Sequence, residues 1–162
     1  YETGEIIRGD RALPVRTDDG LREICCGAWE GLDGNEVEEK YPGQIALWGS
    51  RPEEIRIEGG DTFQEVSERI TDAFWRIVNE NRGKTILITS HMICLTLLMM
   101  RFEGRAVNEL WEVKPIGNAA LNIVEVSEDD KVEITAWSDD SFVPEEDRKG
   151  SALVAGRNYA EE

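Results

Sequence analysis

The fold is decided by residues 62–93, which read TFQEVSERITDAFWRIVNENRGKTILITSHMI. Apolar residues in the first part recur at steps of three and four, which places them in one stripe on one face of an α-helix. Thr62 with Glu65 three residues later forms a capping box, and Gly83 supplies a C-terminal stop. The pattern predicts a helix over residues 62–81 whose buried face consists of Phe63, Val66, Ile70, Phe74 and Ile77.

A strand is predicted directly after this helix. Residues 84–89, KTILIT, form a short apolar and β-branched run, which favours a strand buried on both faces of a sheet. A second, apolar helix is expected over residues 92–101. Helix, strand and helix in this order predict an α/β domain with an at least partly parallel sheet.

Weaker signals predict the remaining elements. Residues 120–126 and 132–136 flank the polar turn 127–131, which is typical of a β-hairpin with a five-residue loop at an antiparallel edge of the sheet. Residues 12–16 are a further strand candidate. The other expectations are short helices over residues 35–41 and 44–50, a loop over residues 51–60, and an irregular C-terminus after Trp137.

Length and charge limit the classes of function. The 162 residues suit one domain, and 34 acidic residues against 18 basic ones give a net charge of −16. This charge repels nucleic acid and anionic membrane surfaces. No apolar run approaches the roughly 20 residues that cross a bilayer. With 40% hydrophobic residues we expect a folded, soluble protein without nucleic-acid or membrane partners; a homodimer stays open.

The cysteines favour a reducing compartment. Cys25, Cys26 and Cys94 are an odd number without metal-binding spacing, and adjacent cysteines rarely pair with each other. We therefore expect free thiols in a cytoplasmic protein. Because they do not form a C-x-x-C motif, we interpret Cys25 and Cys26 as small core or loop residues and not as a redox pair.

His91 is the only histidine of the chain and follows the predicted strand directly. Ligands bind at the carboxyl ends of strands in open α/β sheets. The next helix begins here as well, so that the N–H groups of Met92 and Ile93 offer a cradle for an anion such as phosphate. From position alone, a polar strand-end residue without a functional role is an equal alternative.

The second candidate lies in residues 21–31, LREICCGAWEG. Glu23 is a loop carboxylate in partly apolar surroundings, which suits general acid catalysis. The alternative is one more solvated glutamate of an acidic protein.

Five segments together resemble the histidine phosphatase superfamily, also called the phosphoglycerate mutase-like family. The resemblance covers essentially the whole chain and implies a single domain over residues 1–162. The implied fold is three-layered, with a mostly parallel mixed sheet flanked by helices. In family order the segments are residues 1–7, 21–31 (L-x-E-x-x-x-G-x-W-E-G), 59–63 (like G-G-E-S), 90–92 (like S-H-G) and 118–120 (like N-x-S).

The resemblance also implies a two-histidine phosphoryl-transfer site that needs no metal and no cofactor. In the family, a histidine of an R-H-G motif on the first strand attacks phosphorus. His91 matches the second histidine, which neutralises the transferred group, and Glu23 matches the acid that protonates the leaving oxygen. We expect Met92, Ile93 and Cys26 to bind the substrate, a small phosphorylated metabolite.

The chain departs from the family pattern at several places. The R-H-G histidine is absent from the 162 residues, and the chain opens without Met, as YETGEII, like the end of a helix. We expect the first strand, its nucleophile and the pocket arginines to lie before residue 1, and this chain by itself to be inactive and poorly stable. Met92 stands where the family usually has Gly, and Thr96 where many members carry Arg.

Three classes of function stay open, and the first is a phosphoryl-transfer enzyme. The interval between Glu23 and His91 is short, which favours a phosphatase over the longer mutases of the family. A protein that truly lacks the nucleophile is a pseudophosphatase or binding module. An acidic interaction domain anchored by Trp29, Trp48 or Trp111 is the third reading.

Overall fold

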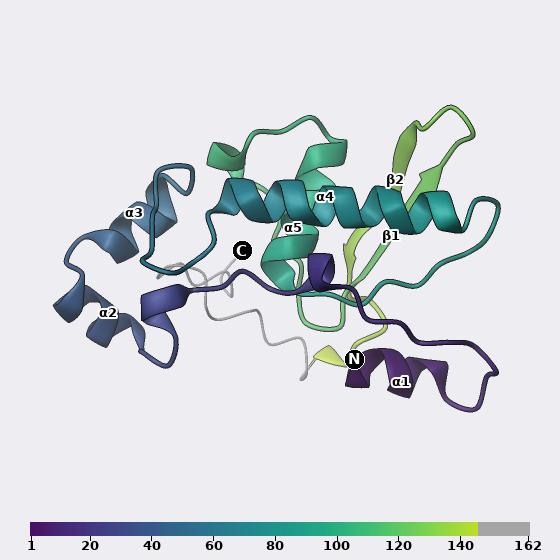
Figure 1. Ribbon diagram of the computed structural model, residues 1–162, viewed down its shortest axis with the longest axis horizontal. Coiled ribbons are helices and arrows are strands. Elements are labelled where there is room, and N and C mark those ends of the chain that lie inside the picture. Colours follow the sequence, from purple (N-terminus) through teal and green to yellow (C-terminus); the bar gives the residue numbers. More distant parts are fainter. Residues whose placement is uncertain (146–162) are drawn as a thin grey trace.

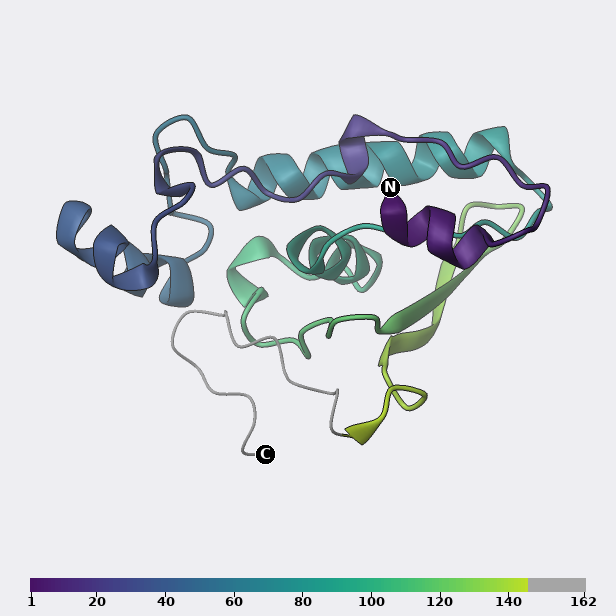
Figure 2. The same ribbon diagram turned by 90° about the horizontal axis from the view of Figure 1, so that it is seen from below.

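Two packed helices form the centre of the fold, and the structure, a computed structural model, describes residues 1–145. Helix α4 (Phe63–Glu80) packs along α5 (Met92–Phe102). The hairpin of β1 (Leu121–Val126) and β2 (Val132–Asp139) lies at one end of α4. The short helices α2 (Gly34–Lys40) and α3 (Gln44–Ser50) lie at the other end (Figures 1 and 2). The predicted irregular C-terminus lies largely outside the described residues.

Helix α4 confirms the strongest sequence prediction. The Thr62 hydroxyl accepts the Glu65 N–H at 3.1 Å, and the Glu65 carboxylate accepts the Thr62 N–H at 2.7 Å. Phe63, Val66, Ile70 and Phe74 are buried as predicted, whereas Ile77 is only half-buried. Val78 takes its place, because a residue four positions after Phe74 lies on the same helix face.

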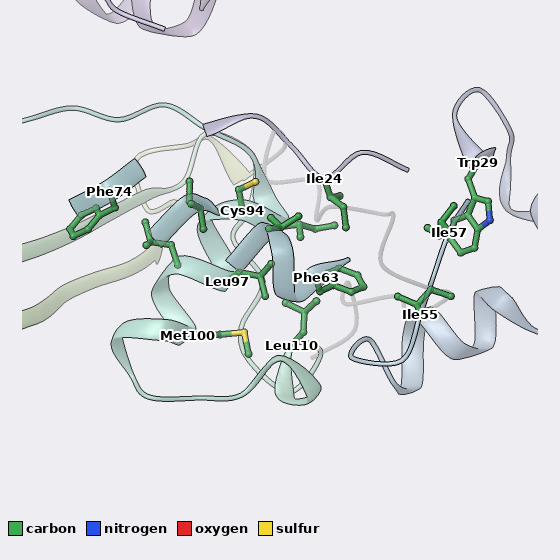
Figure 3. Packing of buried hydrophobic residues seen from close by; sticks show 14 of the residues in the cluster. Ile24, Trp29, Ile55, Ile57, Phe63, Phe74, Cys94, Leu97, Met100 and Leu110 are labelled. Atoms are coloured by element: carbon green, nitrogen blue, oxygen red, sulfur yellow. The ribbon is translucent and has the colours of Figure 1, made fainter. Parts of the chain in front are cut away.

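Helix α5 confirms the second predicted helix. It is apolar nearly all round, as expected for a helix in the centre of a domain. Figure 3 shows its side chains meeting those of α4 and of the segments around Ile24 and Leu110. The buried residues of α5 are Ile93, Cys94, Thr96, Leu97, Leu98, Met99 and Met100.

The tryptophans proposed as interaction anchors belong to the core. The Trp48 ring lies 5.6 Å from Trp29, 4.5 Å from Phe63 and 6.2 Å from Trp111, measured between centroids. The Trp111 indole N–H donates to the Trp48 carbonyl at 2.6 Å. Trp29 is buried, and Trp48 and Trp111 are half-buried. Their contacts favour a role in core packing over a role in binding a partner.

The hairpin is formed as predicted, by strands β1 (Leu121–Val126) and β2 (Val132–Asp139). The strands are antiparallel, and the Ser127 N–H donates to the Lys131 carbonyl at 2.9 Å across the five-residue loop. Strand β2 extends three residues beyond its predicted end at 136.

The other two predicted strands are not formed within residues 1–145. Segments 12–16 and 84–89 are assigned neither to a helix nor to a strand, and the sheet of the described part contains only β1 and β2. Residues 84–87 are exposed, and so the prediction of a strand buried on both faces is wrong for this structure. The backbone N–H and C=O groups of a strand need hydrogen-bond partners on a neighbouring strand, and segments 12–16 and 84–89 have no such neighbour among the described residues.

Short elements complete the described chain. The predicted helices over 35–41 and 44–50 and the loop over 51–60 are confirmed, the first helix with a shift of one residue. Among the described helices, none has the length and hydrophobicity that a membrane span requires. The elements are helices α1 (Glu2–Arg8), α2 (Gly34–Lys40) and α3 (Gln44–Ser50), with 3-10 turns η1 (Asp19–Leu21), η2 (Gly27–Trp29) and η3 (Val107–Glu109).

Candidate functional site

His91 is the residue at which α5 begins. It is the N-cap of the helix with extended backbone angles, and its carbonyl accepts the Leu95 N–H at 2.9 Å. Its side chain is exposed. The sole histidine therefore stands at the predicted helix N-terminus, although the predicted strand before it is not formed in this structure.

The Glu23 carboxylate rests on the first turn of α5. Its Oε2 accepts the Ile93 N–H and its Oε1 the Cys94 N–H, both at 3.4 Å, and Oε1 also accepts the Ile24 N–H at 3.0 Å. The unpaired N–H groups and the dipole at a helix N-terminus favour a negative charge there. The N–H groups of Ile93 and Cys94 thus face a carboxylate of the protein itself. The predicted cradle of Met92 and Ile93 for a phosphate stays a prediction.

Two side chains of the α5 region hold the backbone next to Glu23. The Ser90 hydroxyl donates to the Leu21 carbonyl at 2.7 Å, and the Cys94 thiol donates to the Arg22 carbonyl at 2.8 Å. Burial, followed by the nearby negative charge of Glu23, raises the pKa of Cys94 to about 12. The thiol therefore stays protonated at neutral pH and keeps its role as a hydrogen-bond donor.

Asp61, from the segment that resembles G-G-E-S, anchors the same loop on its other side. Its Oδ2 accepts the Cys25 N–H at 3.1 Å, and its carboxylate forms ion pairs with Arg22 at 3.0 Å and Arg69 at 3.3 Å. Partial burial alone would raise the pKa of Asp61, but the Cys25 N–H bond and the two arginines outweigh it and lower this pKa. Asp61 is therefore a charged anchor at neutral pH.

Cys26 and Gly27 shape the turn after Glu23. The Cys26 N–H donates to the Glu30 carboxylate at 2.8 Å, and burial, followed by the charge of Glu30, raises the pKa of its thiol to about 11. Gly27 has φ +47°, and a Cβ there would lie 2.3 Å from the Glu58 carbonyl oxygen, so only glycine fits. The structure gives Cys26 a place in the turn, and its substrate-binding role stays a prediction.

A small pocket borders this site along α5. Met92, Ile93 and Thr96 line one side, and the lining continues with Leu110, Trp111, Val113 and Pro115. Met92, which stands where the family usually has Gly, adds an apolar side chain here. The buried Thr96 hydroxyl has no hydrogen-bond partner within the described chain.

Residues 1–145 contain no group of three or more potential metal ligands of the His, Cys, Asp and Glu type.

Sequence reasoning missed the residues that hold the candidate acid in place, chiefly Ser90, Cys94, Asp61 and Arg69. Ser90 and Asp61 stand inside the segments that resemble the family motifs, and this position could have indicated that they lie near the site. Arg69 gave a weaker one: it lies three residues after the buried Val66 and is therefore close to the apolar stripe of α4.

The chain belongs to the histidine phosphatase superfamily (branch 1), whose family model matches residues 1–140. It is 24% identical over 128 residues to phosphoserine phosphatase 1 of Hydrogenobacter thermophilus, covering 79% of this chain and 60% of that protein. It is 29% identical over 147 residues to phosphoglycerate mutase-like protein 4 of Arabidopsis thaliana, covering 90% of this chain and 62% of that protein.

A solved structure confirms the predicted fold class. YhfR of Bacillus stearothermophilus superimposes with a TM-score of 0.81 at 30% identity, covering 85% of this chain and 68% of that one. The chain is therefore an α/β protein of the histidine phosphatase fold. It spans less than two thirds of the length of the two curated relatives described above.

Proposed function

We propose that this protein is a phosphatase that hydrolyses phosphate monoesters of small metabolites through a phosphohistidine intermediate. The observation that supports it most is the Glu23 carboxylate on the first turn of the helix that begins at His91. This puts a candidate proton donor and a candidate phosphate ligand at one helix N-terminus. Relatives of the chain carry the names phosphoserine phosphatase and adenosylcobalamin/alpha-ribazole phosphatase.

In the proposed reaction, the residues of this chain manage charge and protons. The nucleophilic histidine nitrogen attacks phosphorus, and the P–O bond to the alcohol breaks while the protonated Glu23 donates its proton to the leaving oxygen. Water then attacks the phosphohistidine and loses its proton to the Glu23 carboxylate, which releases inorganic phosphate. His91 and the Met92 N–H would bind the phosphoryl oxygens, whose charge must be stabilised in the transition state, and the Ile93 N–H would join them when it releases the Glu23 carboxylate.

The nucleophile of this proposal comes from outside the 162 residues, because His91 is the only histidine among them. Two observations support a longer functional protein. The chain covers 60% and 62% of two curated relatives. Segment 84–89 also exposes Ile86 and Leu87, at 37% and 57%, and has no strand beside it in the described part. A cytoplasmic setting is part of the proposal, supported by three free cysteines.

The experiment is to express the full reading frame and to measure phosphate release from p-nitrophenyl phosphate and from phosphoserine, with and without EDTA. We expect activity that EDTA leaves unchanged. His91→Ala on both esters, and Glu23→Gln on phosphoserine, should each lower kcat/KM more than about tenfold, which corresponds to at least ~1.4 kcal/mol of transition-state stabilisation. Glu58→Gln is the matched control, because Glu58 is an exposed carboxylate on the neighbouring loop.

The outcomes distinguish the alternatives. Hydrolysis by the wild type with losses confined to the first two variants supports the phosphatase. Transfer of the phosphoryl group between two hydroxyls of a phosphoglycerate, faster than its release to water, would favour a mutase. A full-length protein that binds phosphate esters without turning them over favours a binding module.

A further inference from the structure

We propose that Arg69 is a positioning residue for Glu23, an inference that rests on the proposed role of Glu23 as the general acid. Arg69 projects from α4, and segment 18–25 runs along this helix in both views (Figures 1 and 2). The Arg69 guanidinium donates hydrogen bonds to several backbone carbonyls of that segment. Its Nη1 donates to the carbonyls of Arg22 at 2.9 Å, Gly20 at 3.1 Å and Asp19 at 3.4 Å, and its Nη2 to the Glu23 carbonyl at 3.5 Å and to Asp61 Oδ2 at 3.3 Å.

The geometry suits arginine and no other side chain. The planar guanidinium carries five N–H donors in a fixed fork, which can bind several carbonyls at once, whereas a lysine ammonium is a point donor on a flexible stem. The Arg69 side chain is only 20% exposed. A buried cation is costly unless it is paired and hydrogen-bonded, and both conditions are met here by Asp61 and the carbonyls.

The Glu23 carboxylate depends on this support. Its bonds to the Ile93 and Cys94 N–H groups are 3.4 Å long, beyond the usual range for N–H···O bonds, and are therefore weak. The location of the carboxylate is set mainly by the backbone of Glu23. The backbone directly before Glu23 is held at the Arg22 carbonyl by Arg69 from α4 and by Cys94 from α5, and at the Leu21 carbonyl by Ser90.

Loss of the Arg69 fork should therefore let residues 20–23 move away from α4 and misplace the acid, although Arg69 itself does not touch the substrate. A misplaced acid slows only reactions that need a proton on the leaving group. An alkyl phosphate such as phosphoserine needs one, while p-nitrophenolate leaves without help. The value of kcat/KM reports the step in which the leaving group departs.

The test compares both esters in the full-length protein and its Arg69→Gln variant. We expect kcat/KM for phosphoserine to fall more than about tenfold and kcat/KM for p-nitrophenyl phosphate to fall less than about threefold. Arg69→Lys keeps the positive charge and provides a second variant should Arg69→Gln fold poorly; it should show the same selectivity with a smaller loss. Arg76→Gln is the control: Arg76 binds Asp18 of the same segment at 2.6 Å, outside residues 20–23.

Equal losses on both esters in Arg69→Gln and Arg69→Lys, in step with a loss of folded protein, would overturn the positioning role and leave the proposed function standing. A folded full-length wild type that hydrolyses neither ester refutes the proposed function, and the role of Arg69 with it. A selective loss in Arg76→Gln as large as that in Arg69→Gln also contradicts the inference, because it would assign the effect to the whole segment.

Discussion

Ser90 and Leu21 are joined by a hydrogen bond of 2.7 Å, in which the Ser90 hydroxyl donates to the Leu21 carbonyl. They lie 69 positions apart in the sequence, and each stands next to the residues proposed for catalysis. Ser90 precedes His91, and Leu21 lies two residues before Glu23. The bond therefore fixes the distance between the two candidate groups through their backbones.

Ser90→Ala should loosen this connection. Losing one partner of a partly buried hydrogen bond costs roughly 1–2 kcal/mol, because the Leu21 carbonyl loses its donor. We expect a loss of that size in urea unfolding and a several-fold lower kcat in the full-length protein. Ser50→Ala is the control, since the exposed Ser50 hydroxyl bonds only to its own helix at the Ala46 carbonyl. An equal effect of the two variants would contradict the structural role of Ser90.

Gly27→Ala should be among the most destabilising single changes in the chain. Its Cβ would meet the Glu58 carbonyl oxygen at 2.3 Å, and its φ of +47° is strained for alanine. We expect a loss of more than ~2 kcal/mol in unfolding free energy. Gly31→Ala provides the comparison, because Gly31 has φ +79° and no heavy atom within 4 Å of a Cβ. It should lose only about 1 kcal/mol, from backbone strain alone; losses of the same size would exclude the steric explanation.

The ionisation of Asp61 should make the stability of the protein depend on pH in the acid range. Its folded pKa lies below its ordinary value, so its stabilising contribution is present above the unfolded pKa of roughly 4 and is lost as the pH falls through the folded pKa. Asp61→Asn should therefore lower stability at pH 7 and flatten its decline below about pH 4. Urea titrations across this range measure both effects. The exposed Asp10→Asn should change neither.

The Cys94 thiol should react slowly with alkylating reagents in the folded protein. Burial raises the pKa values of Cys26 and Cys94 to about 11 and about 12, so little thiolate is available at neutral pH. We expect iodoacetamide to modify Cys94 in the native protein at least about a hundredfold more slowly than in the unfolded chain. Peptide mass spectrometry over time measures this ratio. Rapid native labelling of Cys94 would show that its bond to the Arg22 carbonyl is open in solution.

Thr96→Val should leave stability unchanged or increase it by up to about 2 kcal/mol. The Thr96 hydroxyl is buried without a partner in residues 1–145, and valine has nearly the same shape without the cost of an unpaired polar group. Thermal unfolding of the full-length protein measures the change. A clear loss of stability would indicate that the hydroxyl has a partner in the complete protein, such as a bound water.

The helices and the hairpin could be predicted from the sequence because their hydrogen bonds are local. The capping box of Thr62 and the polar turn at residues 127–131 can be recognised in the sequence, and the structure forms both. The strand predicted over residues 84–89 is not formed in the described chain, because a strand depends on a partner that is distant in the sequence or outside it.

The candidate site divides in the same way. His91 and Glu23 stand in short motifs, and the sequence identified both. Arg69 could not be assigned a role, because four of its five acceptors are carbonyls 46 to 50 residues away and any residue type supplies a carbonyl. Contacts of a side chain with a distant backbone leave no pattern in a single sequence.

The most direct test of the central claim is a rapid-mixing measurement on the full-length Glu23→Gln variant with p-nitrophenyl phosphate. This leaving group departs without an acid, while water attack lacks its base, so a phosphohistidine should accumulate. The account predicts a burst of about one p-nitrophenolate per protein molecule and phosphate bound to the protein in an acid-labile, alkali-stable form. No burst and no protein-bound phosphate, in a folded variant of an active wild type, would contradict it.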